Sequence, residues 1–209
     1  MGYGSFVVFA TQDDTRYDGA MNLDPKTAAL ILIDLQRGIA SRATEPHSSA
    51  DVIARAAQLA EAFRKAHAPV VLVNVGYSSD DGDRLKPPVD QQPPIAFPLP
   101  ADFAELMPEL GATASDIRIT KRQWGAFYGT ELDLQLRRRG VRTIVIGGIS
   151  TNFGVESTAR DAWERNYALV FAEDATASFN GAAHVFAFEN IFPRLGVRSS
   201  TADIIHAIH

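Results

Sequence analysis

The sequence predicts an α/β fold in which a mostly parallel sheet of five or six strands lies between two layers of helices, a Rossmann-like, three-layer α/β/α arrangement. Short continuous apolar runs, typical of strands buried on both faces, alternate with longer segments whose apolar residues recur at helical spacing. Such alternation favours parallel βαβ units, because a helix then connects each strand to the next. The expected strands cover residues 28–33, 69–75, 117–120, 143–146 and 168–172.

Length and composition are those of one globular domain. The chain has 209 residues, of which 46% are hydrophobic and 22% charged, and this length is enough to bury a sizeable core. Residues 1–23 show no sustained hydrophobic period, so we expect an N-terminal extension there and a single domain over residues 24–209. The sequence has no cysteine, which excludes disulfides, thiolate nucleophiles and thiolate metal sites.

The charge pattern argues against nucleic acid as a partner. The net charge is −5, and the one basic cluster is residues 137–139. No basic residue precedes the short apolar run at residues 6–10, so no signal peptide is expected, and no run approaches the ~20 apolar residues of a membrane span. We therefore expect a cytoplasmic protein that does not contact membranes.

Helices are expected between the strands, and two of them begin with a recognisable signal. The pattern at residues 48–51 is that of a capping box, followed by a helix that ends near His67. A second such pattern, at residues 130–133, opens a helix that stops at Gly140. Further helices are expected over residues 153–166, 182–191 and 202–208.

One segment breaks the alternation. Residues 76–101 hold six prolines and few apolar side chains. A connection this long in a compact domain is usually functional, so we expect a lid or wall over a site. The alternative is a plain surface excursion.

Ligands of open α/β sheets bind beyond the carboxyl ends of the strands, so the residues that follow each strand form the candidate site. Asp34 follows the first expected strand, Lys121 follows the third, and a glycine-rich turn at residues 147–154 leads from the fourth into a helix. Burial raises the pKa of a carboxyl group and a nearby ammonium lowers it, so such a pair can exchange a proton near neutral pH. Backbone N–H groups of the turn suit developing negative charge. The alternative is that Asp34 caps a turn, Lys121 is solvated and the glycines only allow tight packing.

Three motifs at these positions resemble the isochorismatase-like superfamily of hydrolases. The first, residues 28–36, ends in Asp-Leu-Gln; the second, residues 121–132, begins Lys-Arg-Gln-Trp-Gly; the third covers residues 148–162. Together they span most of residues 27–208. The resemblance implies the isochorismatase-like form of the α/β/α fold, a small-molecule substrate and a homo-oligomer of two or more chains.

Most members of that superfamily hydrolyse amides with an Asp, a Lys and a Cys. The resemblance places Asp34 and Lys121 at the first two positions and Gly154 at the third, where glycine cannot form a thioester. Isochorismatases themselves also carry glycine there, as does a bacterial subgroup without an assigned substrate that this chain resembles. The resemblance then implies that Asp34 protonates a vinyl ether as general acid, that Lys121 orients it and tunes its pKa, and that Gly154 leaves room for substrate or water.

Substrate contacts are expected around these three residues. The aromatic members would form an apolar wall for a small substrate, with packing in the core as the alternative. By resemblance we also expect the peptide bond between Ile149 and Ser150 to be cis. The expected contacts are Gln36, Tyr77, Trp124, Phe127, Ser150, Thr151 and Asn152.

We expect no metal and no other cofactor. Nicotinamidases of the resembled superfamily bind a divalent ion through an Asp and several His after the second strand, but residues 74–83 contain no histidine. Asp80, Asp81 and Asp83 lack the full calcium-loop pattern and are expected to be solvated. The glycine pair at residues 147–148 lacks the spacing of a dinucleotide loop.

An apolar excess late in the chain also favours a homo-oligomer. One expected helix there is apolar over much of its circumference, more than one face of a sheet can cover. Its apolar residues are Val185, Phe186, Phe188, Ile191 and Phe192.

Three functions remain open. The preferred one is a metal-independent hydrolase that acts by acid catalysis on a small enol ether or a related compound. The second is an amide or ester hydrolase whose nucleophile is water or the hydroxyl of Ser150 or Thr151. The third is a catalytically silent binding protein.

Overall fold

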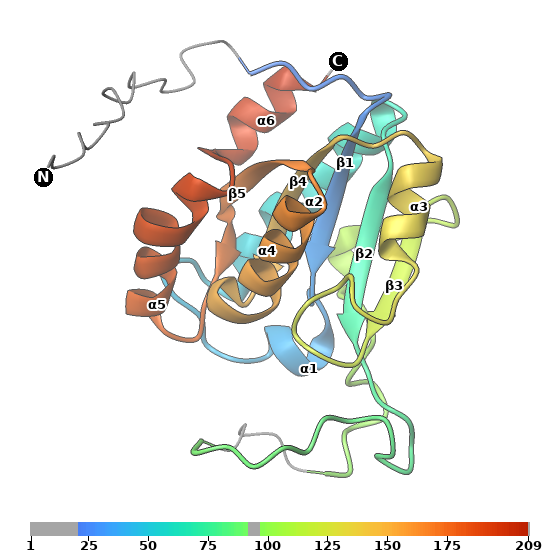
Figure 1. The fold of residues 1–209 in the computed structure, drawn as a ribbon, viewed down its shortest axis with the longest axis vertical. Helices are drawn as coiled ribbons and strands as arrows, with labels where there is room; N and C mark the ends of the chain where they lie inside the picture. The colour runs from blue at the N-terminus through green and yellow to red at the C-terminus, as the bar shows by residue number, and fades with distance from the viewer. Residues whose placement is uncertain (1–20, 92–96, 209) are drawn as a thin grey trace, which may run out of the picture.

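The computed structural model describes residues 21–91 and 97–208, and it has the α/β/α architecture that the sequence predicts (Figure 1). Most of the expected extension over residues 1–23 lies outside the described residues; its last residue, Leu23, is buried and donates its N–H to the carbonyl of Ala207. The strands are β1 Ala28–Ile33, β2 Val70–Val75, β3 Ile117–Lys121, β4 Thr143–Ile149, β5 Ala168–Ala177 and β6 Val197–Ser199. The helices are α1 Arg37–Ala40, α2 Ser49–Lys65, α3 Leu132–Arg138, α4 Glu156–Glu164, α5 Gly181–Phe186 and α6 Thr201–Ala207, with shorter helical turns η1 Pro108–Leu110, η2 Thr151–Val155, η3 Ala187–Ile191 and η4 Phe192–Arg194.

The six strands form one parallel sheet in the order β3-β2-β1-β4-β5-β6. All six residues of β1 are buried, as its continuous apolar run predicts. From β1 the chain adds β2 and β3 on one side of the sheet and then β4, β5 and β6 on the other side. The direction of strand addition therefore reverses between β1 and β4. In open α/β sheets, ligands bind beyond the carboxyl ends of the strands at such a reversal.

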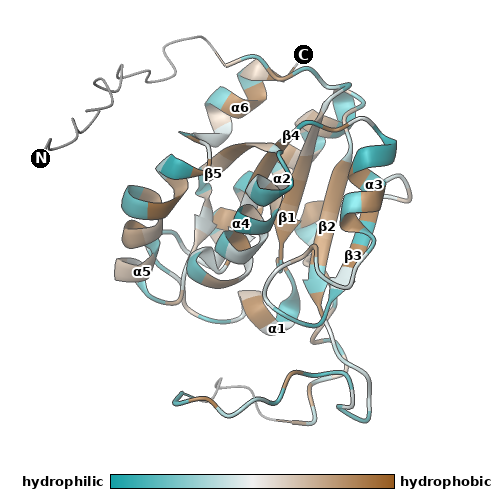
Figure 2. Cartoon of the chain, in the orientation of Figure 1, coloured by the Kyte–Doolittle hydropathy of each residue, from teal (hydrophilic) through white to brown (hydrophobic). Residues whose placement is uncertain are grey.

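Two apolar cores lie on the two faces of the sheet. One is formed with α2 and α6, and the other with α3, α4 and the helical turns after α5. Figure 2 shows apolar strands between helices whose polar side faces outward. The cap of α2 forms as predicted, because the Ser48 hydroxyl accepts the N–H of Asp51 at 3.1 Å. Among the described residues, no helix is long and apolar enough to cross a membrane.

The glycine pair expected in a turn lies instead inside a strand. β4 continues through Gly147 and Gly148 to Ile149, with a shift of its pairing to β5 between Ile146 and Gly148. Gly148 has a φ of 127°, and a Cβ there would collide with the carbonyl oxygen of Ile33 on β1. The glycine therefore allows β4 to approach β1 closely, and the expected turn over residues 147–154 is reduced to Ser150 and the start of η2.

Helix boundaries also differ from the expectations. At α3 the N-cap is Glu131, without a side-chain cap, so the capping box expected at residues 130–133 is wrong. The Thr130 hydroxyl donates to the carbonyl of Ala126 at 2.6 Å and accepts the N–H of Leu132 at 3.1 Å. The helices expected over residues 153–166 and 182–191 each contain a π-helical turn, η2 and η3, and β6 and α1 were not expected.

The long segment after β2 has two parts. Near the sheet, Tyr77 packs on the core and its ring lies 6.0 Å from that of Phe97. Farther out, residues 85–91 are exposed, and Figure 1 shows the segment running apart from the body of the molecule. The expected wall is thus limited to the base of the segment, and its outer part is a surface excursion.

Candidate functional site

Asp34 and Lys121 meet at the carboxyl edge of the sheet. Asp34 directly follows β1 with a left-handed backbone, φ 54°, and Lys121 is the last residue of β3, two strands away. The flexible stem of the lysine spans that gap, and its Nζ donates to Asp34 Oδ2 at 2.7 Å. Both side chains are buried. The predicted contact is therefore present.

The pair is asymmetric in its hydrogen bonds. Lys121 Nζ donates a second bond to the carbonyl of Gln123 at 3.2 Å. Asp34 Oδ2 accepts from the lysine, while buried Oδ1 has no partner among the described residues. Burial raises the pKa of Asp34, and the charge and hydrogen bond of Lys121 oppose that rise without cancelling it. The carboxyl group therefore retains its proton to a higher pH than an exposed aspartate.

Gly154 lies against this pair. A Cβ at Gly154 would be 3.0 Å from Asp34 Oδ2, 3.5 Å from Lys121 Nζ and 2.8 Å from Cγ2 of Ile33. The position that the resemblance aligns with a catalytic cysteine is thus the third member of a compact group. The methyl group of Ile33, on a fully buried strand, leaves little room for a side chain there.

The turn from β4 into η2 carries a small hydroxyl and amide network. The Ile149–Ser150 peptide bond is cis, as expected. Ser150 Oγ donates to Asn152 Oδ1 at 3.0 Å, and Ser178, just after β5, donates to the same oxygen at 2.6 Å. Ser178 was not expected from the sequence, because it lies 26 residues further along the chain and becomes a neighbour only through the pairing of β5 with β4.

Four expected substrate contacts are buried: Ser150 of that network, and three others. Gln36 donates to the carbonyls of Val75 and Phe103, both at 2.9 Å, and accepts the N–H of Val75 at 2.7 Å. Phe127 lies in the core on the face of α3 and α4, 3% exposed. Thr151 is also buried. In the structure these side chains contact protein atoms.

The remaining aromatic candidates border the site. Tyr77 is half-buried, and its pKa is raised by burial and by the charge of Asp34. Trp124 is 62% exposed and its ring lies 4.9 Å from that of Phe153, the neighbour of Gly154. Phe153 was not among the expected contacts, although its place beside Gly154 in the third motif was a signal for it.

Thr151 hydrogen-bonds to a histidine that the sequence analysis did not place in a site. Its Oγ1 is 2.8 Å from Nδ1 of His184, which is 2% exposed and packs on Phe188 with the rings 4.6 Å apart. Nε2 of His184 is buried without a partner among the described residues. Burial, followed by the charges of His47 and Arg198, lowers the pKa of His184 to about 4.

This histidine predicts a pH-dependent stability. In the unfolded chain this histidine becomes protonated below its ordinary pKa of 6.5, whereas in the folded chain it stays neutral down to about pH 4. The folded state therefore loses stability relative to the unfolded state as the pH falls between these two values. Between about pH 7 and about pH 4.5, the free energy of unfolding should fall by roughly 2 kcal/mol less in His184→Gln than in the wild type. Urea titrations at both pH values measure it, and equal losses in the two proteins would contradict the burial of a neutral His184.

The acidic residues after β2 do not fit a metal site. Asp80 accepts from Ser78 at 2.5 Å, Asp81 pairs with Arg84 at 2.6 Å, and Asp83 pairs with Arg122 at 2.5 Å. Their oxygens thus accept hydrogen bonds from protein groups, and the Ser78 hydroxyl contacts both Asp80 and Asp83. Within residues 21–91 and 97–208, no three His, Asp or Glu side chains are grouped as metal ligands.

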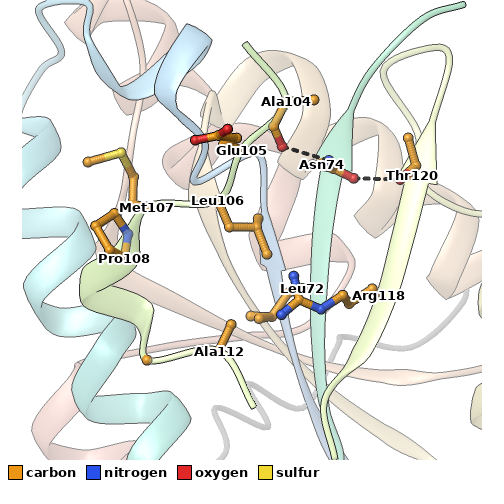
Figure 3. Close-up of a pocket in the computed structure, with 11 residues that line it drawn as sticks. Leu72, Asn74, Ala104, Glu105, Leu106, Met107, Pro108, Ala112, Arg118 and Thr120 are labelled. Atoms are coloured by element: carbon orange, nitrogen blue, oxygen red, sulfur yellow. Dashed lines mark hydrogen bonds between the residues drawn. The ribbon is translucent and has the colours of Figure 1, made fainter. Parts of the chain in front are cut away.

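A separate pocket lies on the other face of β3 from Lys121 (Figure 3). Its wall includes Arg118 and Thr120 of β3 and Asn74 of β2. Asn74 Nδ2 donates to the carbonyl of Ala104 at 2.8 Å, and its Oδ1 accepts from Thr120 at 2.8 Å. The pocket therefore does not contain the buried pair. Its polar groups bind the segment that leads back to β3, near Ala104, to the sheet.

Comparison with known proteins agrees with this fold. The isochorismatase domain model matches residues 28–203. The chain is 50% identical over 188 residues to the isochorismatase family protein YecD of Escherichia coli O157:H7, covering 90% of this chain and 100% of that protein. It is 32% identical over 178 residues to the ureidoacrylate amidohydrolase RutB of Methylorubrum extorquens, covering 73% of this chain and 71% of that protein. A solved structure of an isochorismatase family protein from Burkholderia thailandensis matches with a TM-score of 0.86 and 45% identity, covering 91% of this chain and 99% of that one. The chain therefore belongs to the isochorismatase family of hydrolases.

Proposed function

We propose that this protein hydrolyses a small molecule by general-acid catalysis from Asp34, with support from Lys121 and without a nucleophilic side chain. One observation carries the proposal: a buried carboxyl group has one oxygen held by an ammonium and the other oxygen unpaired, next to a glycine. Burial raises the pKa of this group, which favours the protonated form that a general acid requires. The preferred substrate class is an enol ether.

The proposed reaction starts with proton transfer from Asp34. Oδ1 gives its proton to the terminal carbon of the C=C–O unit, whose π electrons form the new C–H bond and leave an oxygen-stabilised cation. Water adds to that cation and returns a proton to the carboxylate. The resulting hemiketal breaks into a carbonyl compound and an alcohol. Lys121 stabilises the carboxylate while the proton is away, because its ammonium stays bonded to Oδ2.

The other site residues fall into two groups in this proposal. Tyr77, Trp124 and the Ser150–Asn152 network contact the substrate. Gln36, Phe127 and Thr151 act indirectly: they hold the ends of β1 and β2 and the start of η2 in place. Gly154 lets Ile33 and Asp34 pack against the backbone at this position and keeps a side chain out of the approach of substrate or water to Asp34.

A second candidate is hydrolysis of an amide or ester. The similarity to ureidoacrylate amidohydrolase favours it. Because Gly154 offers no nucleophile, water or the Ser150 hydroxyl would attack the carbonyl. Thr151 is less suited to that role because it is fully buried and bonded to His184. A third candidate, a binding protein without turnover, uses the same site residues to bind a ligand and performs no reaction.

A substrate screen separates these candidates. The purified protein is incubated with small enol ethers, amides and esters, with and without a chelator, and products are read by mass spectrometry. We expect turnover of enol ethers, insensitive to the chelator, since the acids after β2 are bound to Ser78, Arg84 and Arg122. Turnover of amides alone supports the second candidate. Ligand binding without turnover of any class contradicts the hydrolase proposal. Chelator-sensitive turnover contradicts metal independence.

A further inference from the structure

The hydroxyl of Thr158 joins two of the segments that form the site. Thr158 lies near the start of α4 and is fully buried. Its Oγ1 donates to the carbonyl of Gly154 at 2.7 Å and accepts the N–H of Ala126 at 3.1 Å. Ala126 belongs to the loop that follows β3, so a single oxygen atom connects that loop to η2.

The second of these bonds distinguishes Thr158 from an ordinary helical threonine. A threonine in a helix often donates to the carbonyl four residues before it, and that bond alone is local. The bond from Ala126 comes from a residue 32 positions away in the sequence. Ala126 is itself fully buried, and a buried N–H group without a partner is costly. The loop is therefore held where its N–H reaches the hydroxyl.

The loop after β3 also carries an acceptor of the lysine in the site. Lys121 Nζ donates to the carbonyl of Gln123 at 3.2 Å. The side-chain amide of Gln123 donates to the carbonyls of Gly125 at 3.0 Å and Tyr128 at 2.7 Å, on the two sides of Ala126. These bonds tie the loop to itself, so the bond at Ala126 also fixes the position of the Gln123 carbonyl.

Together these contacts form a closed circuit around the site. It runs from Asp34 to Lys121, along the loop to Thr158, and from there to Gly154, where a Cβ would be 3.0 Å from Asp34 Oδ2. The sheet holds Asp34 and Lys121 at its carboxyl edge, whereas Gly154 lies on η2, outside the sheet. The hydroxyl of Thr158 is thus a hydrogen-bonded connection between η2 and the loop that contacts Lys121.

We propose that Thr158 is a positioning residue of this site. By holding Ala126 against η2, it fixes the spacing between the ammonium of Lys121 and the backbone at Gly154. The effect on rate rests on the proposed function, in which substrate or water reaches Asp34 past that backbone. A misplacement of about 1 Å can lower a rate by roughly 10²-fold, so a smaller shift of the loop is enough to slow the reaction.

Kinetics of Thr158→Val test this role on the substrate that the screen identifies. Valine is close in shape to threonine but has no hydroxyl, so the loop loses its bond while the space stays filled. We expect kcat to fall roughly 10-fold with little change in KM, the pattern of groups misplaced in the transition state. Thr158→Ser keeps the hydroxyl and should restore most of the rate. Equal kcat in the wild type and Thr158→Val overturns the proposal, as does an equal loss in Thr158→Ser and Thr158→Val.

Thr130→Val is the matched control, because the Thr130 hydroxyl also binds Ala126. It donates to the carbonyl of Ala126 at 2.6 Å and accepts the N–H of Leu132, the first residue of α3, at 3.1 Å. The variant therefore removes the same kind of bond from the same residue, but one that leads to α3 instead of η2. We expect kcat near that of the wild type. A loss as large as that of Thr158→Val would assign the effect to the loop in general and overturn the proposal.

Fluorescence of Trp124 reports the position of the loop without any substrate. Its ring lies 4.9 Å from that of Phe153 on η2, and Trp163 is the other tryptophan of the chain, so Trp163→Phe leaves a single signal. In that background, Thr158→Val should increase the quenching of Trp124 by acrylamide, because the loop moves away from η2. Thr158→Ser and Thr130→Val should not increase it.

This measurement separates the positioning role from the proposed function. Unchanged quenching in Thr158→Val overturns the proposal, whatever the substrate screen finds. Increased quenching in a protein that turns over no substrate contradicts the proposed function alone, because Thr158 then still holds the loop against η2. Increased quenching with unchanged kcat overturns the positioning role, since the loop has then moved without consequence for the reaction.

Discussion

Replacing Asp34 with asparagine is expected to lower kcat roughly 10²–10⁴-fold on the substrate that the screen identifies, because the amide cannot donate the proton of a general acid. The amide is close in size to the carboxyl group and keeps an oxygen for Lys121, so the site retains its shape. Substrate binding should change much less than kcat. Steady-state kinetics, together with a binding titration, measure both effects.

A matched control is available at the other end of the sheet. The side chain of Asp116 is 1% exposed, and it pairs with Arg64 at 2.8 Å just before β3, far from the carboxyl edge that holds Asp34. The pair is part-buried, and removing one partner of such a hydrogen-bonded pair costs roughly 1–3 kcal/mol of stability. Asp116→Asn should therefore destabilise the fold but leave kcat of the folded protein unchanged. If Asp34→Asn retains full turnover, Asp34 is not the acid.

The pH profile provides an independent check of the same role. An acid must be protonated to act, so kcat/KM should fall as the pH rises through the pKa of Asp34. Burial raises that pKa, which moves the fall toward neutral pH. A rate that instead increases as the carboxyl group ionises would identify Asp34 as a base and favour the amide and ester candidate.

Much of the fold follows from local sequence patterns. β1 was predicted to the residue, because a continuous apolar run bounded by Thr27 and Asp34 leaves little freedom in its ends. The N-terminus of α2 was predicted because its cap depends on residues three apart. The contact of Asp34 with Lys121 followed from the rule that parallel strands present their carboxyl ends at one edge.

The errors have physical causes that a local pattern does not contain. Glycines at 147 and 148 suggest a turn, but here they let β4 approach the backbone of β1, which is a tertiary effect. β6 has three residues and is paired only through β5, so it gave no period to detect. Thr130 had the right spacing for a cap, yet its hydroxyl donates to the carbonyl of Ala126 instead.

The site was incomplete for a similar reason. Ser178 directly follows β5 and His184 lies in α5. They reach Ser150 and Thr151 only because β5 pairs with β4 and α5 lies beside η2. Neither stands in the three motifs. Gln36 is part of the first motif, but the motif does not reveal that its side-chain amide hydrogen-bonds to the backbone carbonyls of Val75 and Phe103. Motifs mark the region of the site, and packing decides which side chains face the substrate.

Adding a side chain at Gly154 tests whether the glycine provides space or marks a lost nucleophile. A Cβ there would be 2.8 Å from the Ile33 methyl group and 3.0 Å from Asp34 Oδ2, closer than such atoms normally pack. Overpacking of this kind costs about 1–3 kcal/mol, and here it displaces the acid itself. We expect both Gly154→Ala and Gly154→Cys to lower kcat/KM by roughly 10-fold or more, the factor that ~1.4 kcal/mol of transition-state stabilisation represents.

Gly125 supplies the control for that experiment, because it lies in the same loop as Trp124 and a Cβ there would meet its nearest atom at 3.5 Å, an ordinary contact. Gly125→Cys should therefore keep near-normal turnover. Comparing Ala with Cys at position 154 separates the effect of volume from that of thiol chemistry, and an electrophilic probe reports the reactivity of the thiol. Equal losses in Gly154→Ala and Gly154→Cys, with slow labelling, support a glycine that keeps the approach to Asp34 open. Rapid labelling of Gly154→Cys, new amidase activity and unchanged native turnover would instead identify an amidase site that lacks only its nucleophile, because a thiol beside Lys121 is activated as its pKa falls.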